Sequence, residues 1–344
     1  MRKYNITHLK TPKPLMFKIY ISESVYYDII GTEEKKTEAA RSSLYKLLKL
    51  MTPKEKNQPQ ALKLLSAVET EQYRSHPDTV LKNPSTLYVL NVAPAEASDI
   101  QRRYGVMCLC GEHPNISPLI DVNDIHVSNN GQRLGRGWDS VLDSVEKLPS
   151  NALLLTDRYL FASTQPNAGN GIANIYDILQ ELLPQQFEGG SYHVTIVFDD
   201  MSKEETYSFS DIAAQLEQLK PRLARTYPLM MEVLGITPDC LLYSKLHNRM
   251  IISNYYLVEA AHKLAAFNKD RATARQLIIP LALFTESSLN GISTPPLDAI
   301  NHTLSSLRQF SRSLSYRSFH NDYLYAVNGQ RMERCISMRN RLLK

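Results

Sequence analysis

The sequence predicts an α/β protein, with a mixed sheet flanked by helices in its larger part and a smaller α/β unit before it. Short buried apolar runs alternate with stretches of helical periodicity, which is the pattern of strands and helices in turn. Gly and Pro are ordinary in number, at 13 and 18 of 344 residues, and no repeat of 20–50 residues is present. A chain of this length exceeds the usual single domain, so we expect more than one unit.

The first 115 residues are expected to form the N-terminal α/β unit. Alternating or continuous apolar runs predict strands, and apolar residues at i, i+3, i+4 and i+7 predict helices. PAEASDIQRRYG is expected to be a helix because Pro94 suits its first turn and Gly105 suits its end. Strands are expected at 17–22, 86–92 and 106–111, and helices at 43–51, 61–73 and 94–104. This order of elements favours parallel pairing of the strands.

Residues 116–295 are expected to form the larger domain, in which strands and helices alternate. A turn-rich stretch at 112–137 joins it to the first unit. Strands are expected at 151–157, 192–199, 229–236 and 248–258, and helices at 138–148, 169–184 and 208–226. In such sheets ligands bind beyond the strand ends, so polar residues at those ends are candidates for a site.

Residues 296–344 form a basic C-terminal segment with interleaved aromatic side chains. From Arg308 onward many arginines stand against only Asp322 and Glu333. Guanidinium groups suit phosphates and aromatic rings suit bases, so Arg331 and Arg334 are candidates for contacts with a polyanion. The alternative is a C-terminal helix whose solvated face is rich in arginine.

Composition narrows the class of protein further. No apolar run approaches the length of about 18 residues that a membrane span requires, and no apolar core follows the basic start of the chain. We therefore expect neither a transmembrane segment nor a signal peptide. The four cysteines lack the spacing of a disulfide framework or a zinc site, and no nucleotide-binding glycine loop is present. We expect a reduced, cytoplasmic protein without metal or cofactor.

The stretch SKLHNRMIISNYY, residues 244–256, carries a candidate phosphate-binding motif. His247 and Arg249 are two residues apart, so on a strand their side chains would lie on the same face. An imidazole beside a guanidinium can hold a phosphate oxygen, and the imidazole can also attack phosphorus or donate a proton. The alternative is a buried strand with a satisfied histidine.

His247, Arg249 and Asn254 have the spacing of H-x-K-x-x-x-x-D, the catalytic signature of the phospholipase D superfamily, with Arg for Lys and Asn for Asp. The motif also resembles the degenerate H-x-R motif of the C-terminal, phospholipase-D-like domain of MIT-domain proteins. The resemblance implies a phospholipase-D-like mixed sheet and a phosphate site at these three residues, used for binding and not for catalysis. Arg249 would retain phosphate binding, whereas the Asn254 amide cannot replace a carboxylate.

The same resemblance sets a condition on catalysis. The superfamily reaction uses two copies of the motif, and no second copy occurs among the nine histidines. An active enzyme would therefore need a homodimer to complete its site, with His247 as its catalytic residue.

A second candidate site lies in TDRYLF, at the end of the strand expected at 151–157. Asp157 and Arg158 stand at the exit of that strand, and a glycine-rich turn and a helix N-terminus follow them. Such an arrangement can cradle an anion. We expect both residues to face the same cleft as His247 and Arg249. The alternative is an ion pair that caps a loop.

Three functions follow from these observations. The first is a non-catalytic or weakly catalytic protein that binds nucleic acid or another phosphorylated polyanion, in a bacterial defence or mobile-element system. The second is a phosphodiesterase or nuclease with a site completed by homodimerisation. The third is a structural or adaptor subunit of a larger assembly. The phospholipase-D-like motif favours the first, which predicts binding that weakens steeply with salt.

Overall fold

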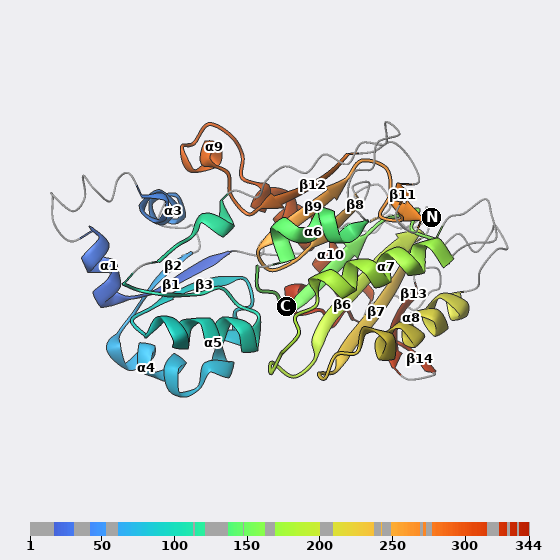
Figure 1. Ribbon diagram of the computed structural model, residues 1–344, viewed down its shortest axis with the longest axis horizontal. Coiled ribbons are helices and arrows are strands. Elements are labelled where there is room, and N and C mark those ends of the chain that lie inside the picture. Colours follow the sequence, from blue (N-terminus) through green and yellow to red (C-terminus); the bar gives the residue numbers. More distant parts are fainter. Residues whose placement is uncertain are drawn as a thin grey trace, which may run out of the picture.

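The computed structural model describes residues 17–30, 42–52, 61–112, 114–120, 137–146, 148–161, 169–199, 209–236, 242, 249–268, 271–272, 277–314, 323–328, 331–335 and 337–343. They form two α/β units, each built on its own sheet (Figure 1). The α/β class expected from the sequence is confirmed. No helix within these ranges is long and apolar enough to cross a membrane.

The N-terminal unit contains a sheet of four parallel strands in the order β2-β1-β3-β4. The strands are β1 (Lys18–Ser22), β2 (Leu62–Leu65), β3 (Thr86–Leu90) and β4 (Cys108–Cys110). The helices between them are α1 (Glu23–Ile30), α3 (Ser43–Met51), α4 (Ala67–Ser75) and α5 (Pro94–Tyr104). The parallel pairing and the strands expected at 17–22, 86–92 and 106–111 are confirmed.

Helix α5 ends where the two units meet. Gly105 follows it in the left-handed conformation, with a φ of 60°. A β-carbon built on Gly105 would lie 2.0 Å from the carbonyl oxygen of Ser150, which precedes the first strand of the larger unit. Glycine is therefore required twice, by the backbone conformation and by the close approach of a neighbouring chain segment.

The single helix expected at 61–73 is wrong, because the chain forms β2 and then α4. Ser66 starts α4 with a capping box. Its hydroxyl accepts a hydrogen bond from the Glu69 N–H at 3.2 Å, and the Glu69 carboxylate accepts one from the Ser66 N–H at 3.0 Å. This cap begins the helix in the middle of the apolar run, and Leu62–Leu65 pair in parallel with β1 instead.

The larger unit contains a mixed sheet of eight strands in the order β12-β9-β8-β5-β6-β7-β13-β14. The parallel centre consists of β5 (Ala152–Thr156), β6 (Tyr192–Asp199) and β7 (Leu229–Ile236). Antiparallel pairing adds β8 (Arg249–Ile252), β9 (Tyr256–Ala260) and β12 (Ile278–Ala282) on one side. It adds β13 (Tyr323–Asn328) and β14 (Arg331–Arg334) on the other. A separate short hairpin joins β10 (Phe267–Asn268) and β11 (Arg271–Ala272).

Helices cover both faces of this sheet (Figure 1). One face carries α6 (Trp138–Glu146), α7 (Gly169–Leu182) and α8 (Phe209–Leu223), and the other carries α10 (Pro296–Leu314). The short α9 (Glu286–Leu289) lies near α3 of the N-terminal unit. Because both faces are covered, every residue of β5 is buried. The strands expected at 151–157, 192–199 and 229–236 are confirmed, as are the helices expected between them.

The single strand expected at 248–258 is also wrong, because β8 and β9 form a hairpin there. The hydroxyl of Ser253 accepts hydrogen bonds from the N–H groups of Tyr255 at 3.1 Å and Tyr256 at 3.3 Å. Local bonds of this kind give the backbone an alternative to continued strand pairing, and the chain reverses. Arg249 and Asn254 consequently lie at opposite ends of β8.

The C-terminal segment, expected at 296–344, is built into the large sheet. Besides α10, β13 and β14, it supplies a strap at residues 337–343. The carboxylate of Glu232, fully buried on β7, accepts hydrogen bonds from the N–H groups of Arg339 at 2.9 Å and Asn340 at 3.1 Å. It also accepts one from the hydroxyl of Thr195 on β6, at 2.7 Å. These donors satisfy the buried carboxylate, so the strap is a part of the core.

The two units share one hydrophobic core. Apolar side chains on one face of the N-terminal sheet belong to the same buried cluster as those of the large sheet. At the β8–β9 turn, Tyr255 inserts into the N-terminal unit. Its hydroxyl accepts a hydrogen bond from the Met107 N–H and donates one to the Thr86 carbonyl, both at 2.8 Å, while its ring meets Phe17 edge-on. The hairpin that begins with Arg249 is therefore anchored in the neighbouring unit.

Candidate functional site

The register of the large sheet places parts of both candidate motifs side by side. β5 and β8 pair antiparallel, with Thr156 opposite Met250. One residue further on, Asp157 leaves β5 beside Arg249, the first residue of β8. The structure therefore brings Asp157, Arg158 and Arg249 to one end of the sheet, the carboxyl end of β5. His247 lies outside the described residues, and the face that it shares with Arg249 stays a prediction.

Asp157 is a buried carboxylate that holds two loops. It is 1% exposed, and its Oδ1 accepts a hydrogen bond from the Tyr159 N–H at 2.9 Å. Its Oδ2 accepts one from the Leu264 N–H at 2.6 Å. The first bond fixes the turn at 157–160 after β5, and the second fixes the loop at 261–266 after β9. Asp157 therefore holds these two loops together at the site.

Burial raises the pKa of Asp157 to about 6. The hydrogen bonds from the Leu264 and Tyr159 N–H groups and the positive charges of Arg249 and Lys263 oppose this rise. At neutral pH the carboxyl is mostly ionised, so it balances part of the positive charge around it.

Tyr159 is the most exposed side chain of this group, and two guanidinium groups lie against its ring. Its exposed fraction is 41%, and the ζ-carbons of Arg158 and Arg249 lie 5.6 Å and 5.5 Å from the ring centroid. These are cation–π distances. Arg158 is 8% exposed and Arg249 is partly exposed, so the ring and Arg249 face the solvent. We call these three residues the Arg–Tyr cluster.

The loop at 261–266 supplies a further cation to the site. Lys263 is partly exposed and lies close enough to Asp157 to lower the pKa of its carboxyl. Asn174 of α7 fixes the end of the same loop, because its amide donates to the Phe267 carbonyl at 2.7 Å and accepts from the Phe267 N–H at 3.0 Å. The site is therefore framed by the ends of β5 and β8 and by this loop.

Tyr159 and Lys263 were not predicted as site residues. Tyr159 lies within TDRYLF, so its place directly after a strand end was the available signal. Lys263 reaches the site because β9 runs back along β8, and the sequence did not predict that hairpin.

The chemistry of the described residues favours binding of an anion. Arg249 and Lys263 lie close enough to the Asp157 carboxylate to lower its pKa, and both oxygens of that carboxylate already accept backbone hydrogen bonds. Asp157 is therefore poorly placed to act as a free base. Within the described parts of the chain, no group of three or more His, Cys, Asp or Glu side chains is arranged to hold a metal ion.

The structure does not bring Asn254 to this site. Its Oδ1 accepts a hydrogen bond from the Asn151 N–H at 2.9 Å, and its Nδ2 donates to the Pro84 carbonyl at 2.9 Å and to the Asn151 side chain at 3.0 Å. The side chain is 3% exposed and lies between the two units, at the far end of β8 from Arg249. Its donors and acceptor are used within the protein.

Arg331 and Arg334 lie on β14, at the edge of the sheet and four strands away from β5. Neighbouring strands are about 4.8 Å apart, so this separation is roughly 19 Å across the sheet. The two arginines therefore do not join the Arg–Tyr cluster. A ligand that contacts both places would have to be long.

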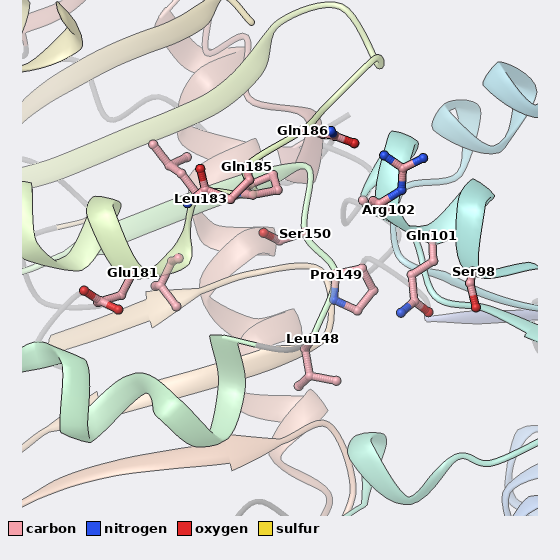
Figure 2. A pocket seen from close by; sticks show the side chains of 13 residues that line it. Ser98, Gln101, Arg102, Leu148, Pro149, Ser150, Glu181, Leu183, Gln185 and Gln186 are labelled. Carbon is pink, nitrogen blue, oxygen red and sulfur yellow. The ribbon is translucent and has the colours of Figure 1, made fainter. Parts of the chain in front are cut away.

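A separate hollow lies between the units, near the amino end of β5. Its volume is about 520 Å³. Figure 2 shows Gln101 and Arg102 of α5 on one side and Leu183 and Gln185 on the other, with Ser150 and Gln186 between them. Arg102, the one cation among the described residues that line the hollow, forms an ion pair with Asp99. The hollow therefore provides less positive charge for binding an anion than the carboxyl end of β5 does.

No protein-family model matches this chain, and no curated protein resembles it closely enough in sequence to count as a relative.

Proposed function

We propose that this chain binds nucleic acid or another phosphorylated polyanion at the carboxyl end of β5. The observation that carries the proposal is the Arg–Tyr cluster, in which two guanidinium groups lie within 5.6 Å of the centroid of one half-exposed tyrosine ring. Guanidinium groups are well suited to phosphate oxygens, and aromatic rings accompany them where nucleic acids bind.

The charge of the site supports a phosphate ligand. The positive charges of Arg249 and Lys263 act on the Asp157 carboxylate, and the Arg158 guanidinium lies against the same Tyr159 ring as that of Arg249. Arg249 is partly exposed, and its guanidinium forms one long hydrogen bond, at 3.4 Å from Nη1 to the Ala261 carbonyl. Its Nε is buried, so a ligand would meet the terminal nitrogens of the guanidinium.

The sequence motif supports the same class of ligand. His247 and Arg249 resemble the phospholipase D signature, whose His and cation both suit a phosphate. Asn254, the third residue of the motif, is used at the junction between the units. This division of the motif supports binding over hydrolysis, in a large mixed sheet that we propose to be phospholipase-D-like.

The test compares Arg249→Ala with Arg222→Ala. Arg222 is a matched control, since its guanidinium also lies against a tyrosine ring, 4.5 Å from the centroid of Tyr176, but on helices α8 and α7. Fluorescence anisotropy measures the affinity for a labelled oligonucleotide at several salt concentrations. Loss of the Arg249 phosphate contact should weaken binding roughly tenfold and reduce the slope of log K against log salt by about 1.

The control separates a specific site from a general effect of charge. Arg222→Ala should bind like the wild type, because it removes the same charge at another place. An equal loss of affinity in both variants, or unchanged binding by Arg249→Ala, would overturn the proposed site. Far-UV circular dichroism of both variants checks that the fold is intact.

A further inference from the structure

We infer that the ligand of this site is a single-stranded nucleic acid, one of whose bases stacks on the Arg–Tyr cluster. The inference rests on the proposed function and names the substrate class. It starts from the contrast between two neighbours in the chain: Arg158 is 8% exposed, whereas Tyr159 is 41% exposed. The turn after β5 thus buries a cation and presents an aromatic ring to the solvent.

An exposed ring is of little use to a ligand that offers phosphates alone. An inositol phosphate or a lipid headgroup needs cations, and a duplex presents phosphates while its bases remain stacked inside. A single strand offers unpaired bases, which stack on aromatic rings and on guanidinium planes, and its phosphates reach nearby cations. Tyr159 is exposed and Arg249 is partly exposed, so both kinds of contact are available.

The ring is also held in place before any ligand arrives. The Tyr159 N–H donates to the buried carboxylate of Asp157, and the Leu160 N–H donates to the Asp157 carbonyl at 3.2 Å, which closes the turn. The guanidinium groups of Arg158 and Arg249 lie against the ring. A ring fixed in this way loses little conformational freedom when a base stacks on it, which favours affinity.

The surroundings of Tyr159 differ from those of another exposed tyrosine. Tyr27 is 55% exposed, but its ring packs edge-on against Tyr26, with centroids 5.6 Å apart, on helix α1. Exposure of a tyrosine is therefore not sufficient by itself. What distinguishes Tyr159 is exposure together with two cations at the end of a central strand.

The experiment compares three probes of equal length by fluorescence anisotropy: single-stranded oligothymidine, an abasic single strand and a duplex. The abasic strand keeps the phosphates and lacks the bases. The proteins are the full chain, Tyr159→Ala, Tyr159→Phe and the control Tyr176→Ala, which removes the ring next to Arg222. Circular dichroism checks that each variant is folded.

We expect the wild type to bind oligothymidine roughly tenfold or more tightly than the abasic strand, because stacking contributes about that much per base. Tyr159→Ala should remove this preference, whereas Tyr159→Phe and Tyr176→Ala should keep it. Equal affinity of the wild type for oligothymidine and the abasic strand, with binding still dependent on Arg249, would overturn the inference and leave the proposed function standing. So would tighter binding of the duplex. No binding of any probe would overturn both.

Discussion

The carboxylate of Asp157 lies at the centre of the site without being free to react. A buried acid with a raised pKa beside cations is often a catalytic group. Here both oxygens accept backbone N–H groups, one from its own turn and one from the loop after β9. The physical role of Asp157 is therefore to fix the turn that presents Tyr159. Its buried negative charge destabilises the folded state, because burial disfavours the ionised form.

The destabilisation by this buried charge can be measured through the pH dependence of the free energy of unfolding. The pKa of Asp157 is about 6 in the folded chain, above the ordinary value of 3.8, so the folded state holds the proton more tightly than the unfolded state does. As the pH rises from about 4 to 6, the wild type should lose up to about 3 kcal/mol of folding free energy relative to a variant that does not titrate at this position.

Asp157→Asn is that variant, because it keeps the shape of the side chain and is neutral at every pH. Urea unfolding of both proteins between pH 4 and 7.5 gives the difference in their free energies of unfolding. As the pH rises, Asp157→Asn should become more stable relative to the wild type. Any constant effect of the amide cancels in the slope. A difference that does not change with pH would show that the carboxyl has an ordinary pKa.

At the scale of elements, the strands that are buried on both faces could be predicted from the sequence. The helix expected at 61–73 and the strand expected at 248–258 could not, because each stretch forms two elements. β5 was predictable because helices cover both sides of it, so its sequence is a continuous apolar run. The errors at 61–73 and 248–258 have one physical cause. In each case a serine within an apolar stretch begins a new element through its hydroxyl, Ser66 by capping α4 and Ser253 by turning the β8–β9 hairpin. Hydrophobic periodicity does not register such local hydrogen bonds.

The same hairpin explains how much of the site could be predicted. Asp157, Arg158 and Arg249 lie at one end of the sheet, and the end of β5 could be located from the sequence because it follows an apolar run. Asn254 does not lie there, since the spacing of the motif carries no information about the turn at Ser253. The hairpin directs Asn254 into the junction between the units, far from Arg249.

The anchoring of this hairpin gives a prediction about stability. Tyr255→Phe keeps the buried ring and removes the hydroxyl, which leaves the Met107 N–H and the Thr86 carbonyl without this partner. Buried polar groups deprived of a partner cost about 1–3 kcal/mol, and urea unfolding should show a loss of that size. Tyr27→Phe is the control, because that residue is 55% exposed and water can reach its hydroxyl. A loss of equal size in both variants would contradict the proposed anchor.

At the scale of the whole molecule, composition and element order suggested separate units, whereas the contacts that join them are long-range. Tyr255 of the larger unit and Thr86 of the N-terminal unit are 169 residues apart in sequence. Arg339 of the expected C-terminal segment and Glu232 of β7 are 107 residues apart. No local pattern reports such contacts. The boundary expected near residue 115 follows the last strand of the first sheet, yet the hydrophobic core continues across it. The expected C-terminal segment likewise completes the large sheet.

A shared core predicts that the two units unfold together. Trp138, the single tryptophan of the chain, lies in α6 of the larger unit, so its fluorescence reports on that unit, whereas far-UV circular dichroism reports on both. Urea unfolding followed by the two probes should give superimposable transitions. Tyr255→Phe sharpens the test, because the hydroxyl partners of Tyr255 at Thr86 and Met107 belong to the N-terminal unit. If the units are coupled, losing those bonds moves the Trp138 transition to lower urea by the same amount as the dichroism transition. Independent units would instead give a two-step dichroism curve, and only one of its steps would coincide with the fluorescence.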